Sequence, residues 1–410
     1  MNKKKESKVV PNVRFKGFTD DWKQRKLGEL LISLQNNTLS REELSDELGV
    51  AKNVHYGDIL IKFGNVLDVS KERFPMISDE GVLEKYKESF LKNGDVIVAD
   101  TAEDSTVGKC SEISGLNDEV VLSGLHTIPY RPIEKFAFGY LGYYLNSSAY
   151  HDQLIPLMQG IKVTSISKSA MKDTEIVYPK SVEEQGKVAE YFRNLDRLIT
   201  LHQQKITRLI KLKKAMLEKM FPKKGSVIPE IRFNGFANAW EQRKVRDVTD
   251  RYDNLRIPVA ANLRVSGTTP YYGANGIQDY VDGYTHDGEF ILVAEDGAND
   301  LKNYPVRCVK GRIWVNNHAH VLQGKYDSAD NKFLACAISQ ADIESLLVGG
   351  GRAKLNAENL MDMNLLLPNK AEQIRIGKYL AQLAHLITLH QRKLDMLKKL
   401  KSACLSEMFI

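Results

Sequence analysis

Two long segments of the chain place hydrophobic and polar residues at the spacing of an amphipathic helix. They run from about residue 183 to 221 and from about 371 to 409. In the first segment the apolar positions are Tyr191, Leu195, Leu198, Ile199, Ile206, Leu209, Met216, Leu217 and Met220. This pattern predicts helices with one hydrophobic face that needs a partner. At 1.5 Å per residue, each helix would be about 58 Å long.

The second helical segment repeats the first at an offset of 188 residues. The hexapeptide Leu-Ile-Thr-Leu-His-Gln at 198–203 returns unchanged at 386–391. Both segments close on Met-Phe, at 220–221 and at 408–409. A gap-free repeat of this length indicates that the helix is duplicated.

A second motif is duplicated upstream of each helix, at an offset of 218 residues. Residues 11–18 and 229–236 share a proline, an Arg-Phe pair and a Gly-Phe pair, and Trp22 matches Trp240. The layout is therefore motif, variable block and long helix, followed by the same three parts again.

Both variable blocks, 31–182 and 249–370, contain strand-like and helical runs. The predicted strands are 58–63, 95–99, 120–122, 289–293 and 312–315, and the predicted helices are 40–44 and 136–147. The first block closes on residues 176–179 and the second on residues 365–368. The ends of the two blocks can be matched, pairing Gly160, Ile166, Met171 and Pro179 with Gly349, Leu355, Leu360 and Pro368. Both blocks thus look like versions of one module.

The predicted fold class is α+β. Two α/β domains related by a pseudo-twofold axis would be separated by two long antiparallel helices that form a coiled-coil spacer. The predicted parts are a first domain at 1–182, whose first ten residues are a disordered basic lead-in, a helix at 183–221, a second domain at 222–370 and a helix at 371–410.

The helix boundaries carry capping signals. Ser181 with Glu184, and Asn369 with Glu372, form the spacing of a capping box. Pro222 ends the first helix because proline cannot continue the backbone hydrogen-bond ladder.

The repeated histidines lie at the midpoints of their helices. If the helices pair antiparallel in central register, His202 and His390 lie near the pseudo-twofold axis and meet. The alternative is that both are ordinary polar residues of the helix seam.

Composition narrows the class of protein. The chain has 410 residues, enough for two or more domains, with 43% hydrophobic residues, 27% charged residues and a net charge of +6. The basic N-terminus is not followed by an apolar run, which argues against a signal peptide, and no window predicts a membrane span. The four scattered cysteines suggest neither a zinc site nor disulfides and fit the cytoplasm.

No catalytic constellation, metal-ligand spacing or nucleotide-phosphate loop is evident in the sequence. Loops that combine glycine with hydroxyls, amides and cations are the candidates for contacting DNA, since such side chains pair with base edges and phosphates. The structural alternative for each residue is a role in turn formation. The candidates are Thr101, Ser105, Lys109, Lys162, Thr164, Tyr272, Asn275, Asn299, Lys302, Asn316, Asn317, His318, Arg352 and Lys354.

The ordered set of motifs resembles the DNA-specificity subunit of bacterial type I restriction–modification systems. The resemblance rests on the paired openings, the paired block ends, the paired helices, and two strings at 270–277 and 314–320. It implies that each block is a target recognition domain for one half of a bipartite, asymmetric site on double-stranded DNA. It also implies a non-catalytic chain that binds two methyltransferase subunits and two restriction subunits in the bacterial cytoplasm.

The resemblance places the cofactors on those partners. S-adenosylmethionine, ATP and Mg²⁺ are expected there, and no cofactor is expected on this chain. Two alternatives remain at this stage: an endonuclease or fused restriction–methylation enzyme with its own active site, and a coiled-coil adaptor that binds only proteins.

Overall fold

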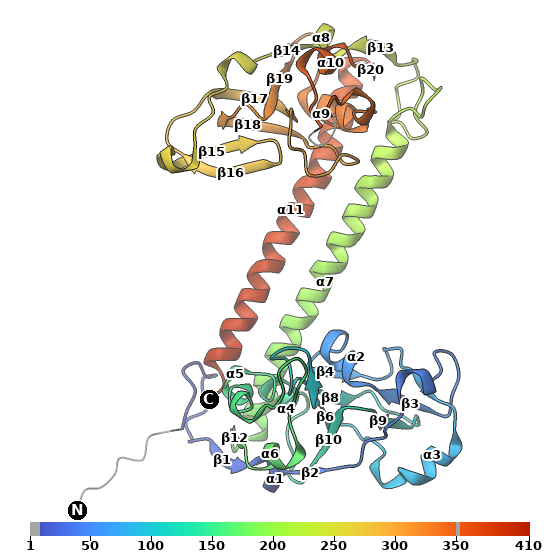
Figure 1. The fold of residues 1–410 in the computed structure, drawn as a ribbon, viewed down its shortest axis with the longest axis vertical. Coiled ribbons are helices and arrows are strands. Elements are labelled where there is room, and N and C mark those ends of the chain that lie inside the picture. The colour runs from blue at the N-terminus through green and yellow to red at the C-terminus, as the bar shows by residue number, and fades with distance from the viewer. Residues whose placement is uncertain (1–8, 350–352) are drawn as a thin grey trace, which may run out of the picture. The chain divides into compact units, whose positions relative to one another are not determined.

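The structure, a computed structural model, describes residues 9–349 and 353–410. It contains two long helices, α7 (Val182–Met220) and α11 (Lys370–Glu407), labelled in Figure 1. These confirm the two helices predicted from the hydrophobic pattern. The chain divides into two compact units. The first unit combines the chain up to Leu201 with Lys393–Ile410, and the second is His202–Arg392.

A five-stranded mixed sheet forms the centre of the first unit. Its order is β2 (Leu31–Ser33), β10 (Thr127–Pro132), β6 (Val96–Ala99), β8 (Cys110–Ser114) and β4 (Val66–Asp68). Every residue of β6 and β8 is buried. This explains why β6 is a continuous apolar run rather than an alternating one, because both of its faces are covered.

Smaller sheets complete the strands of the first unit. They are β5 (Met76–Ile77) with β3 (Ala51–Val54) and β9 (Val121–Ser123), β1 (Lys23–Lys26) with β12 (Glu175–Tyr178), and β7 (Thr101–Ala102) with β11 (Thr164–Ser165). The strands predicted at 95–99 and 120–122 are confirmed.

Short helices connect these strands. They are α1 (Leu27–Leu30), α2 (Tyr56–Ile61), α3 (Glu80–Lys85), α4 (Tyr140–Tyr144), α5 (Ser148–His151) and α6 (Lys168–Lys172), with 3-10 turns at Arg41–Glu43, Lys87–Ser89 and Ile155–Leu157. The tyrosines of α4 are fully buried against α7 and the end of the chain. Phe409 stacks on Phe192 with ring centroids 5.6 Å apart and meets Tyr140 edge-on at 5.8 Å.

The first unit shows how the long helices pair. Tyr191 of α7 contacts Cys404 of α11 through its hydroxyl, 3.4 Å from Sγ. Five residues later on α7, Asp196 forms an ion pair with Lys401, with 2.5 Å between oxygen and nitrogen. Residue numbers rise on one helix as they fall on the other, so the two helices are antiparallel here.

A six-stranded sheet forms the centre of the second unit. Its order is β14 (Thr249–Arg251), β19 (Ala319–Gly324), β17 (His286–Ala294), β18 (Val306–Val315), β15 (Ser266–Gly273) and β16 (Gly276–Val281). A separate pair joins β13 (Glu241–Lys244) to β20 (Asn364–Leu367). These strands confirm the predictions at 289–293 and 312–315.

The helices of the second unit pack on this sheet and on the long helices. They are α8 (Val245–Val248), α9 (Asn331–Gln340) and α10 (Ala357–Asp362), with 3-10 turns at Asp253–Leu255, Ala261–Leu263 and Glu344–Leu346. Phe221, just beyond α7, stacks on Phe333 of α9 at 5.3 Å and meets Trp240 edge-on at 5.7 Å. The Met-Phe pair after α7 thus enters the core of the second unit, as the pair after α11 enters the core of the first.

The N-terminal motifs dock on helix ends in the same repeated way. In the first unit the backbone N–H of Val13 donates to the carbonyl of Glu407 at 2.9 Å. In the second unit Ile231 donates to Lys219 at the same distance. Each copy of the motif therefore contacts the C-terminal end of a long helix. The copy before the first block packs on α11, and the copy before the second block packs on α7.

Three local predictions were wrong. Residues 58–63 are not a strand, because α2 occupies them after His55, whose Nδ1 accepts a hydrogen bond from the backbone of Gly57 at 3.3 Å. A short apolar run fits either structure, and only this cap decides between them. The helix predicted at 136–147 is shorter in the structure, where α4 covers its middle. It begins after Gly139, because this residue adopts a left-handed φ of 86°. Residues 40–44 form a single 3-10 turn.

The capping boxes form only in half. The Ser181 hydroxyl accepts from the backbone of Glu184 at 3.4 Å, and the Asn369 side chain accepts from Glu372 at 3.0 Å. The glutamate side chains do not return to the caps. They bind the arginines of the N-terminal motifs instead, because a guanidinium is a stronger partner for a buried carboxylate than a backbone N–H. Within the described residues, no helix is both long and apolar enough to cross a membrane.

Candidate nucleic-acid interface

The two candidate loops of the first unit lie side by side. β7 and β11 form an antiparallel ladder in which Thr164 pairs with Ala102 and Ser165 with Thr101. The Thr101 hydroxyl donates to the carboxylate of Asp100 at 2.8 Å. Loops separated by about 60 positions in the sequence are thus joined into one structure through backbone hydrogen bonds.

The turn at 160–163 projects from this ladder. Gly160 has φ of 118°, and a Cβ on it would lie 1.9 Å from the carbonyl oxygen of Val163, so only glycine fits there. At the tip Ile161 is fully exposed, and Lys162 is also exposed. The sequence candidate Lys162 therefore has a free path to a ligand.

Ser105 and Lys109, the other candidates in this unit, differ in their surroundings. Ser105 is exposed in a turn. Lys109 is half-buried, and its ammonium donates to the carbonyl of Leu60 at 2.6 Å. Burial lowers the pKa of Lys109. The side chain of Lys109 therefore braces the loop against α2, and its ammonium is already committed to that contact.

The second unit repeats this arrangement, which we call the loop frame: two residues that exchange backbone hydrogen bonds, followed by a residue whose N–H donates to a carbonyl of another loop. Val348 and Lys354 exchange two backbone hydrogen bonds of 2.9 Å, as Gln159 and Ser165 do at 2.9 and 2.8 Å in the first unit. The next residue also matches, since Leu355 donates to the carbonyl of Glu295 at 2.7 Å and Ile166 donates to Asp100 at 2.8 Å. The alignment of Gly160 and Ile166 with Gly349 and Leu355 is therefore confirmed. The candidate Arg352 lies outside the described residues.

The remaining candidates of the second unit lie in or beside the loops that follow β15, β17 and β18. Asn275, between β15 and β16, donates from its amide to the carbonyl of Gly297 at 2.8 Å and accepts from the backbone of Asn299 at 3.0 Å. Asn275 therefore ties one loop to the next, while Asn299 and Lys302 remain exposed.

The turn after β18 separates buried from exposed candidates. Asn316 is only 4% exposed, and its side chain accepts from the backbone of His318 at 2.9 Å. It is a turn former rather than a side chain presented to a ligand. His318 pairs through Nδ1 with Asp296 at 2.5 Å, and Asn317 is exposed. Tyr272 is half-buried, and burial raises its pKa.

A network of charges lies behind these loops. Glu295 pairs with Arg256 at 2.6 Å and with Lys354 at 2.8 Å, while Asp253 pairs with His320 at 2.7 Å. Burial opposes ionisation of Glu295, yet the bonds from Lys354 and Arg256 hold its pKa below the ordinary value. One carboxylate oxygen of Asp253, one of Glu295 and a ring nitrogen of His320 lie within 4.8 Å of one another, close enough to bind one metal ion. Because the two cations already balance these carboxylates, the cluster is best explained as an ion-pair network that holds Lys354 in place.

Several residues near these loops carry no signal in the sequence. Arg307 of β18 is exposed and donates to the carbonyl of Asn275 at 3.1 Å, so its guanidinium sits among the candidate loops. Arg256 was likewise missed. Their partners are distant in sequence, and nothing in the local pattern marks them.

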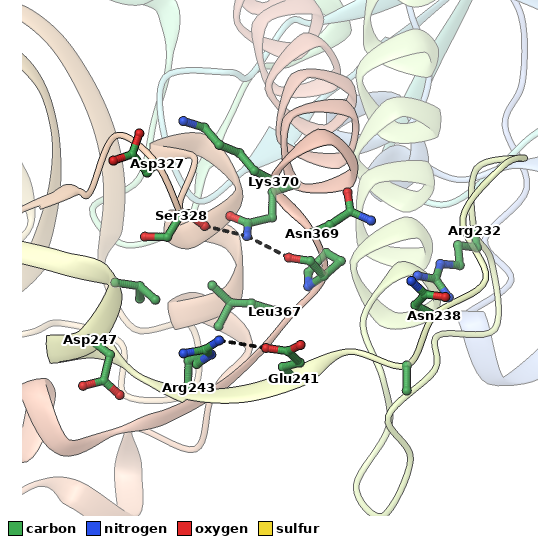
Figure 2. A pocket seen from close by; sticks show the side chains of 14 residues that line it. Arg232, Asn238, Glu241, Arg243, Asp247, Asp327, Ser328, Leu367, Asn369 and Lys370 are labelled. Atoms are coloured by element: carbon green, nitrogen blue, oxygen red, sulfur yellow. Dashed lines mark hydrogen bonds and ion pairs between the residues drawn. The ribbon is translucent and has the colours of Figure 1, made fainter.

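A separate polar hollow of about 290 Å³ lies where α11 begins (Figure 2). The two arginines that line it are paired: Arg232 binds Glu372 through two hydrogen bonds of 2.6 and 2.7 Å, and Arg243 pairs with Glu241 at 2.9 Å. Gln373 donates to the carbonyls of Ser328 and Pro368 in the same place. The hollow is a structural junction and contains none of the candidate DNA-contacting residues.

Known proteins share this organisation. The family model for the type I restriction modification DNA specificity domain matches residues 19–211 and 237–399. A Methanocaldococcus jannaschii protein named as the MjaX specificity subunit is 22% identical over 93% of this chain and 91% of its own length. A Haemophilus influenzae protein named as a type I restriction enzyme specificity subunit is 43% identical over 36% of this chain, which spans only 38% of that relative.

The fold agrees with the sequence comparisons. The crystal structure of a type I restriction–modification S subunit from M. genitalium matches 98% of this chain and 99% of its own with a TM-score of 0.68, at 14% identity. With both repeats matched by the family model, the chain belongs to the DNA-specificity subunits of type I restriction–modification systems.

Proposed function

We propose that this chain recognises a bipartite, asymmetric DNA site, with one block reading each half. The observation that carries the proposal is the loop frame that occurs once in each unit, held by equivalent backbone hydrogen bonds. A shared frame with different side chains suits two half-sites of different sequence, because backbone geometry positions the loop and side chains select the bases.

The two loop sets offer different chemistry to DNA. The first presents hydroxyls and one exposed cation, at Thr101, Ser105 and Lys162. The second presents exposed amides and an arginine, at Asn299, Asn317 and Arg307. Amides pair well with adenine and arginine with guanine, so the second block has the more direct means of reading base edges.

The long helices supply the second part of the proposal, which is to set the gap between half-sites and to bind partner subunits. Half-sites on one face of DNA repeat about every 34 Å, and a continuous helix keeps such a distance better than a flexible linker. Each unit leaves three leucines of its helix pair exposed at equivalent positions: Leu198, Leu201 and Leu400 in the first, and Leu386, Leu389 and Leu212 in the second. Exposed apolar side chains that repeat in this way suit two copies of one partner.

Those partners would be two methyltransferase subunits, with two restriction subunits joining for cleavage. In this account S-adenosylmethionine, ATP and Mg²⁺ act on the partners, and the present chain contributes recognition.

The exposed tip of the first frame provides a direct test. Ile161→Ser, Lys162→Ser and Val163→Ser together remove its side chains while Gly160 and the flanking hydrogen bonds remain. Sequencing of methylated adenines in host DNA should then show relaxed specificity in one half-site only. An unchanged motif, or loss of both halves in a protein with unaltered thermal unfolding, would contradict the assignment of one block to one half-site.

A further inference from the structure

The second unit brings together the two histidines of the repeated hexapeptide. His202 of α7 and His390 of α11 face each other with 2.9 Å between their Nδ1 atoms and 5.0 Å between ring centroids. Both side chains are half-buried, so one side of the pair remains open to solvent. The contact confirms the central register expected from the sequence.

The same atom of each ring faces the other, which limits what can lie between them. As a hydrogen bond, one Nδ1 must carry a proton while the other offers a lone pair, so the two rings must differ in tautomer or in charge. A metal ion accepts a lone pair from each ring and allows both histidines to adopt the same state. The second arrangement suits two side chains that are equivalent by the internal repeat.

The separation of the nitrogens indicates which ions fit. Two nitrogens 2.9 Å apart, each about 2.05 Å from a metal, subtend an angle of about 90° at the ion. Square-planar and tetragonal Cu²⁺ or Ni²⁺ sites require this angle between neighbouring ligands. Tetrahedral Zn²⁺ would need the nitrogens about 0.4 Å further apart.

We propose that His202 and His390 form a two-nitrogen site for Cu²⁺ or Ni²⁺ that links α7 to α11, with water in the remaining positions. Such an ion would stabilise the helix pair, because the unfolded chain does not hold the two imidazoles together. The site is independent of DNA recognition, so its failure would leave the proposed function intact.

Electron paramagnetic resonance of the purified full-length chain with less than one equivalent of Cu²⁺ tests the site. The proposal predicts hyperfine splitting from two imidazole nitrogens. His202→Gln and His390→Gln should each weaken Cu²⁺ binding at least tenfold, and the double variant should be no weaker than either one, since the two residues act as one site. His385→Gln removes an exposed histidine of the same helix and should leave binding unchanged.

If the spectrum of the wild-type chain shows splitting from one imidazole nitrogen or from none, the proposal is wrong. Wild-type affinity in either glutamine variant would overturn it as well. Circular dichroism without metal checks that each variant keeps its helices. In the wild type, saturating Cu²⁺ should raise the Tm, and this rise should be lost in both variants but kept in His385→Gln.

Discussion

Replacing Arg232 with methionine is expected to destabilise the second unit strongly. The guanidinium of Arg232 donates two hydrogen bonds to Glu372, whose side chain is 0% exposed. Methionine preserves much of the apolar stem but leaves this carboxylate buried without its cation. Breaking a buried ion pair from one side costs about 3–5 kcal/mol. In a unit of this size each kcal/mol lowers the Tm by about 2–4 °C, so a loss of about 10 °C is expected.

Two matched variants calibrate this effect. Arg14→Met breaks the equivalent pair in the first unit, but Glu184 also accepts a hydrogen bond from the Trp22 indole at 3.3 Å. The loss should therefore be smaller by about 1 kcal/mol. Arg243→Met breaks a pair whose side chains are 55% and 72% exposed, and should cost less than about 1 kcal/mol.

Thermal unfolding of the full chain, followed by circular dichroism and tryptophan fluorescence, measures all three variants. The expected order of destabilisation is Arg232→Met, then Arg14→Met, then Arg243→Met. If Arg232→Met lowers the Tm no more than Arg243→Met does, the ion pair between Arg232 and Glu372 does not stabilise the start of α11. The structural role assigned to the duplicated arginine would then be wrong.

Three further predictions concern the first unit. Burial raises the pKa of Glu112 to about 7 from an ordinary value of 4.5. Because the folded state then binds the proton more tightly than the unfolded state, stability should fall by about 3 kcal/mol as pH rises between these values. Unfolding of Glu112→Gln should lack this slope, and an equal slope in the variant would reject the assignment. Gly160→Ala should destabilise the turn at 160–163 by more than about 1 kcal/mol, because the position has φ of 118°. One half of the methylated motif should then become less specific. Gly64→Ala, where the nearest atom to a new Cβ is 3.9 Å away, is the control and should leave the motif unchanged. Lys162→Ala should reduce the slope of log affinity against log salt by about 1 in DNA-binding titrations, and an unchanged slope would exclude a phosphate contact.

The repeats made much of this architecture predictable from the sequence. Two copies at fixed offsets predict equivalent elements, so the two helices and the matching of Gly160 with Gly349 followed from alignment. The meeting of His202 with His390 also required the helices to pair in central register, which the alignment does not specify. Strongly apolar runs such as β6 were also predictable, because burial on both faces leaves a clear mark on composition.

Side-chain roles in the loops were less predictable. Asn316 and Asn317 are neighbours of one type, yet the first is buried in a turn and the second is exposed. The pairing of Asp253 with His320 joins residues 67 positions apart, and no local pattern signals it. Polar residues in loops obey several local rules equally well, and only tertiary contacts decide among them.

If each variable block reads its own half-site, exchanging one block changes only one half of the recognised sequence. The experiment replaces residues 31–182 with the corresponding block of another family member and sequences methylated adenines across the genome of the host. One half of the methylated motif should change while the other half stays the same. Change in both halves, or in neither, would contradict it.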